Sequence, residues 1–77
     1  MTLYDMEIGD SGIVKELTGG KEFRNRLTSF GITKDCEFIL KALTMMRNVF
    51  SIELKNGTSV ALRKGESKKI KVELCKK

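Results

Sequence analysis

The sequence of 77 residues contains no histidine, no proline and no tryptophan. Without histidine, acid–base catalysis near neutral pH would need a carboxylate or a lysine with a strongly shifted pKa, and a domain of this length has little interior in which to shift it. The two cysteines, Cys36 and Cys75, also have no histidine that would activate them as nucleophiles. The sequence therefore predicts a protein that is not an enzyme and has no catalytic residues.

Residues that bind metals are scarce as well. Zinc and softer metals are usually held by histidine or by closely spaced cysteines, and the two cysteines here stand far apart in the chain. Asp5, Glu7 and Asp10 leave open a carboxylate site, beside the interpretation of this segment as an acidic turn in solvent. We expect no metal site and no cofactor. Two cysteines are also too few for a disulfide-stapled secreted scaffold, which favours a reducing compartment.

No hydrophobic run is long enough to cross a membrane. The longest apolar stretch, residues 38–46, is interrupted by Lys41, whereas a spanning helix needs about 20 residues. The first ten residues include three acidic side chains, in a place where a secretory leader would be basic and then apolar. The sequence therefore predicts a cytoplasmic protein that does not insert into a membrane by itself.

The chain does contain a series of short segments in which apolar residues alternate with polar ones. Such segments are typical of half-buried strands, and the turn residues between them favour a small barrel that closes its own edges. The pattern alone leaves both an SH3-like and an OB-like barrel open. Asn56-Gly57 predicts a tight hairpin turn in which two residues have positive φ. The expected strands are residues 12–17, 36–42, 49–54, 58–63 and 70–74, with one helical turn or a loop at 64–68.

One segment, residues 21–32, has helical periodicity instead. Phe23, Leu27 and Phe30 fall on one narrow stripe, which we expect to face the core. Glu22 in the first turn is placed to pair with Arg26 one turn later. The sequence thus predicts one short amphipathic helix between the first and second strands.

The residues that flank these elements also carry predictions. Gly31 is expected to end the helix in a left-handed conformation, and Ile32 to fold back onto the core. Leu3 and Met6 are candidates to cover one end of the barrel.

Several weak signals occur in a definite order along the chain. They are Gly9, Gly12 and Gly19-Gly20, then Arg24-Asn25-Arg26-Leu27 and Phe30-Gly31-Ile32, and finally Leu62-Arg63. Their order and spacing, from about Leu3 to Glu73, resemble the ferrous iron transport protein A family (FeoA). The resemblance implies a mainly β fold: one FeoA-like domain over residues 1–77, built as a small SH3-like barrel of about five strands with one short helix after the first strand. It also implies a cytoplasmic accessory or regulatory protein of bacterial ferrous iron uptake, which binds the GTP-binding part of the membrane iron transporter.

The positive charge of the chain supports an alternative function, a small basic barrel that binds nucleic acid. The net charge is +5 and the pI is about 9.4. Tyr4 is the one aromatic side chain left for stacking on bases, because all four phenylalanines are assigned to the core, so we expect no nucleic-acid partner. The basic residues gather late in the chain, at Arg63, Lys64, Lys68, Lys69, Lys71, Lys76 and Lys77.

Two surfaces are better suited to a protein partner. The first is the loop between the second and third strands, where flexible methionines either adapt to a partner or fold inward and plug the barrel end. The second is the polar face of the helix, which is otherwise plain solvated surface. The predicted partner-binding residues are Arg24, Asn25 and Thr28 on the helix and Leu43, Met45, Met46 and Arg47 in the loop.

Overall fold

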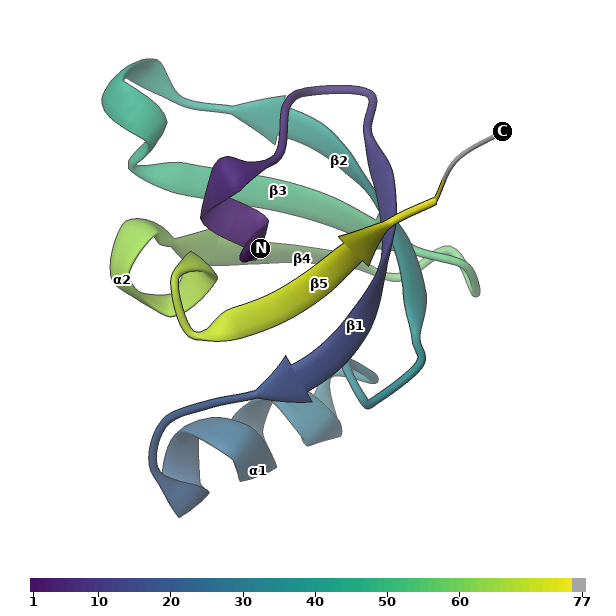
Figure 1. Cartoon of the computed structure of the whole chain (residues 1–77), viewed down its shortest axis with the longest axis vertical. Helices are drawn as coiled ribbons and strands as arrows, with labels where there is room; N and C mark the ends of the chain where they lie inside the picture. The colour runs from purple at the N-terminus through teal and green to yellow at the C-terminus, as the bar shows by residue number, and fades with distance from the viewer. Residues whose placement is uncertain (76–77) are drawn as a thin grey trace.

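The computed structural model describes residues 1–75, so Lys76 and Lys77 of the predicted basic cluster lie outside the described residues. One antiparallel sheet of order β4-β3-β2-β1-β5 curls around a single core, and a helix lies against one end (Figure 1). The elements are η1 (Leu3–Asp5), β1 (Ser11–Leu17), α1 (Lys21–Ser29), β2 (Glu37–Leu43), η2 (Met45–Arg47), β3 (Val49–Leu54), β4 (Ser59–Arg63), α2 (Lys64–Ser67) and β5 (Ile70–Leu74). The predicted mainly β fold, with five strands and a short helix after the first, is confirmed.

The strand register places the apolar positions of neighbouring strands opposite one another. Phe38 pairs with Leu54, and Phe50 with Leu62. All four of these side chains are buried. Because directly opposed side chains on one face of a sheet contact each other, this alignment forms a continuous apolar interior. Leu3 and Met6 are also buried in it, as expected.

The edge of the sheet at β5 is covered in a way that the sequence did not predict. We expected a barrel that closes its own edges, but in residues 1–75 the ladder ends at β4 on one side and at β5 on the other. The N-terminal segment covers β5 instead: Val72 N–H donates to Met1 O at 2.9 Å, and Thr2 forms a β-bridge with Lys71. Covering an edge satisfies its backbone groups without a further strand.

A bulge in β2 changes which face Ala42 occupies. Strict alternation from Phe38 and Leu40 would turn Ala42 inward, yet this residue is exposed. The register between β2 and β3 shifts between Leu40 and Ala42, so one extra residue interrupts the period of two. Leu43, the next residue, therefore becomes the one that packs against the core.

The end of α1 is confirmed in detail. Gly31 has φ of +95°, and Ile32 N–H donates to Leu27 O at 2.9 Å while Gly31 N–H donates to Thr28 O at 3.0 Å. This pair of bonds is the Schellman motif, in which a left-handed residue lets the chain reverse. Ile32 is consequently buried in the core.

Two expectations for the body of α1 are wrong. Phe30 is 44% exposed, because it caps a helix that ends at Ser29 and Ile32 fills the core position next to it. Arg26 pairs with Glu66 at the end of α2, and not with Glu22, because α2 comes close enough to offer a carboxylate. Of the predicted apolar stripe, only Leu27 is fully buried.

The hairpin between β3 and β4 is confirmed, but its turn differs from the predicted one. Only Gly57 has positive φ, at +93°, and Asn56 does not. Gly57 N–H donates to Leu54 O at 2.9 Å and Leu54 N–H donates to Thr58 O at 2.8 Å, which is the pattern of a longer loop with glycine at its left-handed position. The Asn56 side chain accepts from Thr58 N–H at 2.9 Å, so β4 begins one residue later than expected.

Candidate partner-binding surface

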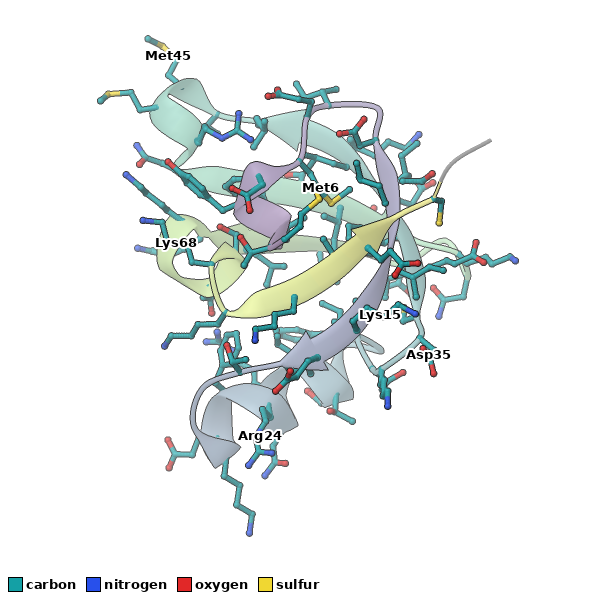
Figure 2. The ribbon with its side chains drawn as sticks, viewed as in Figure 1. Met6, Lys15, Arg24, Asp35, Met45 and Lys68 are labelled. Atoms are coloured by element: carbon teal, nitrogen blue, oxygen red, sulfur yellow. The ribbon has the colours of Figure 1, made fainter. Side chains whose placement is uncertain are left out.

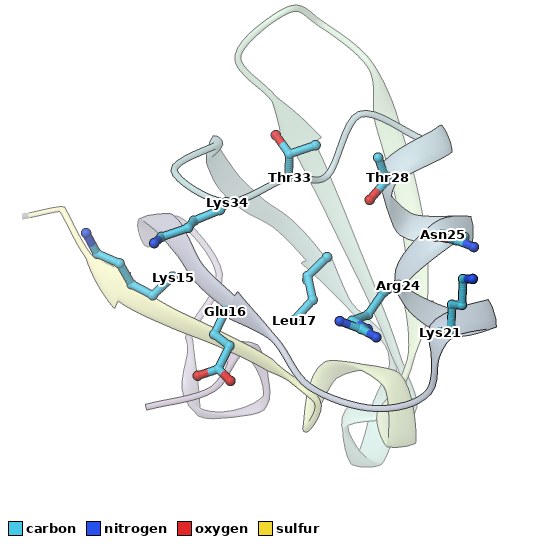
Figure 3. A pocket seen from close by; sticks show the side chains of 9 residues that line it. All are labelled: Lys15, Glu16, Leu17, Lys21, Arg24, Asn25, Thr28, Thr33 and Lys34. Carbon is cyan, nitrogen blue, oxygen red and sulfur yellow. The ribbon is translucent and has the colours of Figure 1, made fainter.

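The polar face of α1 forms one wall of an open groove. The groove has a volume of about 600 Å³, and β1 and the turn before β2 supply its other wall. Figure 3 shows Leu17 between strand and helix, with the Arg24 guanidinium turned from the helix toward the strand. The lining residues are Lys15, Glu16, Leu17, Lys21, Arg24, Asn25, Thr28, Thr33 and Lys34.

The groove is electrostatically positive. Four of its lining side chains are cationic and one, Glu16, is anionic. The Glu16 carboxylate lies 3.8 Å from Nζ of Lys71, a residue of β5 that does not line the groove, so part of its negative charge is offset there. Within residues 1–75, no carboxylate oxygen lies within 4.0 Å of the charged nitrogens of Lys21, Arg24 or Lys34. These three charges are therefore available to a ligand.

The helix that carries this wall is attached to the barrel by a few contacts. Leu27 is fully buried beneath it, and Phe23 is half-buried against the core. The Phe23 ring lies 5.9 Å from the Arg26 guanidinium carbon and 5.3 Å from Nζ of Lys69, which stands in the turn between α2 and β5, so two cations contact the ring. Gly19 lets the chain before α1 pass close to the Phe23 ring, since a Cβ at position 19 would stand 3.1 Å from that ring.

The loop between β2 and β3 presents two methionines to solvent. Met45 and Met46 are 87% and 82% exposed, so they do not plug the barrel end, and that alternative is wrong. Met46 and Arg47 have φ of 61° and 55°, in the left-handed region that residues other than glycine seldom adopt. Such a backbone persists only when its surroundings hold it in place.

Arg47 supplies that hold. Its Nη2 donates to Tyr4 O at 2.8 Å and also to Met6 O, and its Nε lies 3.3 Å from Tyr4 O. A longer contact of 3.5 Å joins Nη1 to Glu7, whose side chain is 72% exposed and adds little. The guanidinium thus ties the loop to the N-terminal segment, and most of its donors are used inside the molecule.

Two residues of the predicted basic cluster, Lys64 and Lys68, lie over Tyr4. The Lys68 and Lys64 nitrogens lie 4.9 and 5.8 Å from the centre of its ring, which also packs at 5.7 Å from Phe50. Tyr4 is therefore a half-buried ring beneath cations and does not offer a free face for stacking on a base. Phe30, which we had assigned to the core, is the more exposed aromatic.

The acidic N-terminal residues form local turns. Asp5 accepts from Thr2 N–H at 3.0 Å and from the Thr2 hydroxyl at 3.2 Å, and the backbone bond is the main cause that lowers the pKa of Asp5. Asp10 likewise accepts from Glu7 N–H at 2.9 Å. Within residues 1–75, no three histidine, cysteine or carboxylate side chains are grouped as a metal site. Over the same range, no helix has both the length and the apolar composition needed to span a bilayer.

The structure separates the predicted binding residues into two groups. Arg24, Asn25 and Thr28 line the groove, whereas Met45 projects from the opposite end of the long axis (Figure 2), and Met46 follows it in η2. Leu43 packs partly on the core. Sequence reasoning missed Lys15, Leu17, Thr33 and Lys34, because only the fold brings β1 and the turn at 33–35 beside α1. Their signal in the sequence was weak, a lysine in a strand and another in a turn.

Comparison with known proteins points to one family. A family model described as the FeoA domain matches residues 1–74. A protein of Campylobacter jejuni, provisionally named Fe(2+) transport protein A, is 34% identical over 74 residues, which cover 96% of this chain and 99% of that protein.

Solved structures agree on the fold. The FeoA-like protein of Clostridium acetobutylicum has a TM-score of 0.86 at 26% identity, over 100% of this chain and 88% of that one. FeoA of Stenotrophomonas maltophilia, solved with zinc, has a TM-score of 0.75 at 25% identity, over 95% and 89% of the two chains. It is described as a prokaryotic SH3 domain protein with a candidate role as a ferrous iron transport activating factor.

Proposed function

Because this chain belongs to the FeoA domain family, we propose that it is an accessory protein of bacterial ferrous iron uptake that binds the cytoplasmic GTP-binding part of the membrane iron transporter. The observation that carries the proposal is the family match over residues 1–74. The Campylobacter jejuni relative supports it, since it spans nearly the same length and is named for Fe(2+) transport.

In this role the chain works through its surface and not through catalysis. The sequence has no histidine, and the groove beside α1 is open to solvent and lined mostly by polar side chains. Two exposed features can contact another protein: the groove beside α1 and the methionine tip formed by Met45 and Met46. Both lie on elements held by the sheet, so they are presented in fixed positions.

We further propose that the chain acts in the cytoplasm and regulates iron movement without holding the iron. Both cysteines are free: Cys36 is hydrogen-bonded to β1 at Val14, on the β2 side, and Cys75 is hydrogen-bonded to β1 at Ser11, on the β5 side. Adding ferrous iron to the anaerobic protein in a calorimeter is expected to give no stoichiometric binding in the submicromolar range. Tight uptake would contradict this part of the proposal.

The main test is capture of the partner. Purified full chain, immobilised, is expected to retain the cytoplasmic GTP-binding domain of the ferrous iron transporter from the same organism, and cells that lack the chain are expected to take up ferrous iron more slowly. Replacing the chain with the Leu27→Ala variant, which loosens α1, tests whether folded protein is needed. Normal uptake without the chain, together with no retention, would overturn the proposal.

A further inference from the structure

We propose that the groove between α1 and β1 binds an extended acidic peptide segment of the protein partner. This inference rests on the proposed function for the identity of the partner, but the chemistry of the ligand comes from the groove itself. The side chains of Lys21, Arg24 and Lys34, which no described carboxylate pairs with, all line this groove, and their natural complement is a run of carboxylates.

The two walls of the groove hold these cations on both sides of the site. Lys21 and Arg24 come from the exposed face of α1, one turn apart, whereas Lys15 and Lys34 come from β1 and from the turn before β2 (Figure 3). Asp35, the nearest acid to Lys15, is 3.9 Å away and 69% exposed, so it competes weakly for that lysine. Carboxylates spaced along a chain can meet both walls at once.

The strand supplies a reason for the ligand to be extended. The ladder between β1 and β2 ends at Ile13. Beyond it on that side, only Val14 is bonded, through its N–H to Cys36 O and its C=O to Asp35 N–H. The ladder between β1 and β5, in contrast, continues to Leu17. Thr18 N–H donates to Lys69 O on the β5 side at 2.8 Å. Since backbone groups alternate along a strand, Leu17 directs its N–H and C=O to the groove side. An extended segment can pair with this short edge.

The side chains in the middle of the groove suit such a peptide. Leu17 offers a half-buried apolar contact, and Asn25, Thr28 and Thr33 offer uncharged donors and acceptors. The volume of about 600 Å³ lies within the range of ligand clefts, which extends from roughly 300 to 1,000 Å³. Alternating acidic and aliphatic residues would place carboxylates on the cations and an aliphatic side chain on Leu17.

The binding test is an NMR titration of the full ¹⁵N-labelled chain. The probe is a capped peptide of alternating glutamate and valine, and the control is the same peptide with glutamine for glutamate. The glutamate peptide is expected to shift the amides of Leu17, Arg24 and Lys34 in a saturable way, and to lose affinity as salt rises and screens the charges. Equal binding of the glutamine peptide, or shifts confined to the end of the molecule near Lys68, would overturn the proposal.

Charge reversal locates the site. The double variant Arg24→Glu with Lys34→Glu is expected to lower the affinity for the glutamate peptide by about tenfold or more, because two ion pairs are lost and replaced by repulsion. Lys41→Glu, which makes the same change of charge as each single reversal at an exposed position of β2, is expected to leave affinity within about twofold. Equal effects of the three substitutions would contradict a local site. A single-stranded oligonucleotide that shifts the same amides at lower concentration than the peptide would also overturn it.

The same variants separate this inference from the proposed function. If the double variant retains the transporter domain as well as the wild-type chain does, the function stands and the groove is not its site. If the wild-type chain fails to retain the domain while the peptide binds in the groove, the function fails and the acidic-ligand inference stands.

Discussion

Arg24 and Arg47 show how the same side chain serves two ends of this molecule differently. Arg47 is bound to the carbonyl oxygens of Tyr4 and Met6, and it holds a left-handed backbone in place. Arg24 lies in a groove, and no described carboxylate is close enough to pair with it. The difference comes from the acceptors that each neighbourhood offers. One end uses its positive charge to hold itself together, and the other leaves it available to a partner.

The largest expected effect tests how the groove end is attached. Leu27→Ala removes the one fully buried side chain of α1, and is expected to lower the free energy of unfolding by about 3 kcal/mol through lost burial and the cavity left behind. Urea denaturation measures the loss. Phe30→Ala, at the C-cap of the same helix, is the control, and because Phe30 is 44% exposed it should cost about 1 kcal/mol or less. Similar losses would mean that the two side chains anchor α1 equally.

The next effect addresses the two arginines directly. Arg47→Ala leaves the carbonyls of Tyr4 and Met6 without their charged donor, which is expected to cost about 2 kcal/mol of stability. Arg24→Ala is expected to change stability by less than about 0.5 kcal/mol, as at other exposed positions. Thermal and urea unfolding of both variants would sharpen the comparison. A stability loss at Arg24 equal to that at Arg47 would break it.

A smaller effect concerns the strained tip at the opposite end. Met46→Gly is expected to stabilise the protein by about 0.5 to 1 kcal/mol, because glycine adopts φ of 61° without the steric cost that methionine bears. Met45→Gly, next to it and equally exposed, has no positive φ to relieve and is expected to destabilise slightly. If both substitutions shift the unfolding temperature in the same direction, backbone strain is not the cause.

The smallest effect depends on pH. The hydrogen bond from Thr2 N–H holds the pKa of Asp5 below its ordinary value of 3.8. The contribution of ionised Asp5 to the free energy of unfolding is therefore complete above that pH, and it is lost as the pH falls through the folded pKa. Asp5→Asn is therefore expected to be less stable than the wild type near neutral pH, and the gap should close in strong acid. Urea unfolding at several pH values measures it, and a gap that widens in acid would show that the sign is wrong.

The fold could be predicted largely from the sequence because its elements are marked locally. The strands follow the alternation of apolar residues, and Gly31 with Ile32 specified the end of α1 to the residue. The deviations came from long-range contacts. The bulge beside Ala42 can be recognised only when the pairing of β2 with β3 is known. The pairing of Arg26 with Glu66 likewise depends on the position of α2 relative to α1.

The candidate site was only half visible in the sequence. Arg24, Asn25 and Thr28 could be chosen because a helix has a recognisable polar face. The opposite wall, with Lys15 and Lys34, consists of residues that are ordinary in their own segments and become a site only when β1 and the turn are brought beside α1. The anchoring of Arg47 was missed for the same reason, since its acceptors lie some 40 positions earlier in the chain.

The pairing of Met1 and Thr2 with β5 has a consequence for association between copies of this protein. Those two residues occupy backbone groups of the edge strand β5 that would otherwise be available to a second copy. Trimming them should uncover Val72 N–H and favour sheet-to-sheet dimers or larger aggregates at high concentration. A purification tag fused ahead of Met1 would extend the chain directly beside that strand, so preparations tagged there are expected to differ in oligomeric state from those tagged elsewhere.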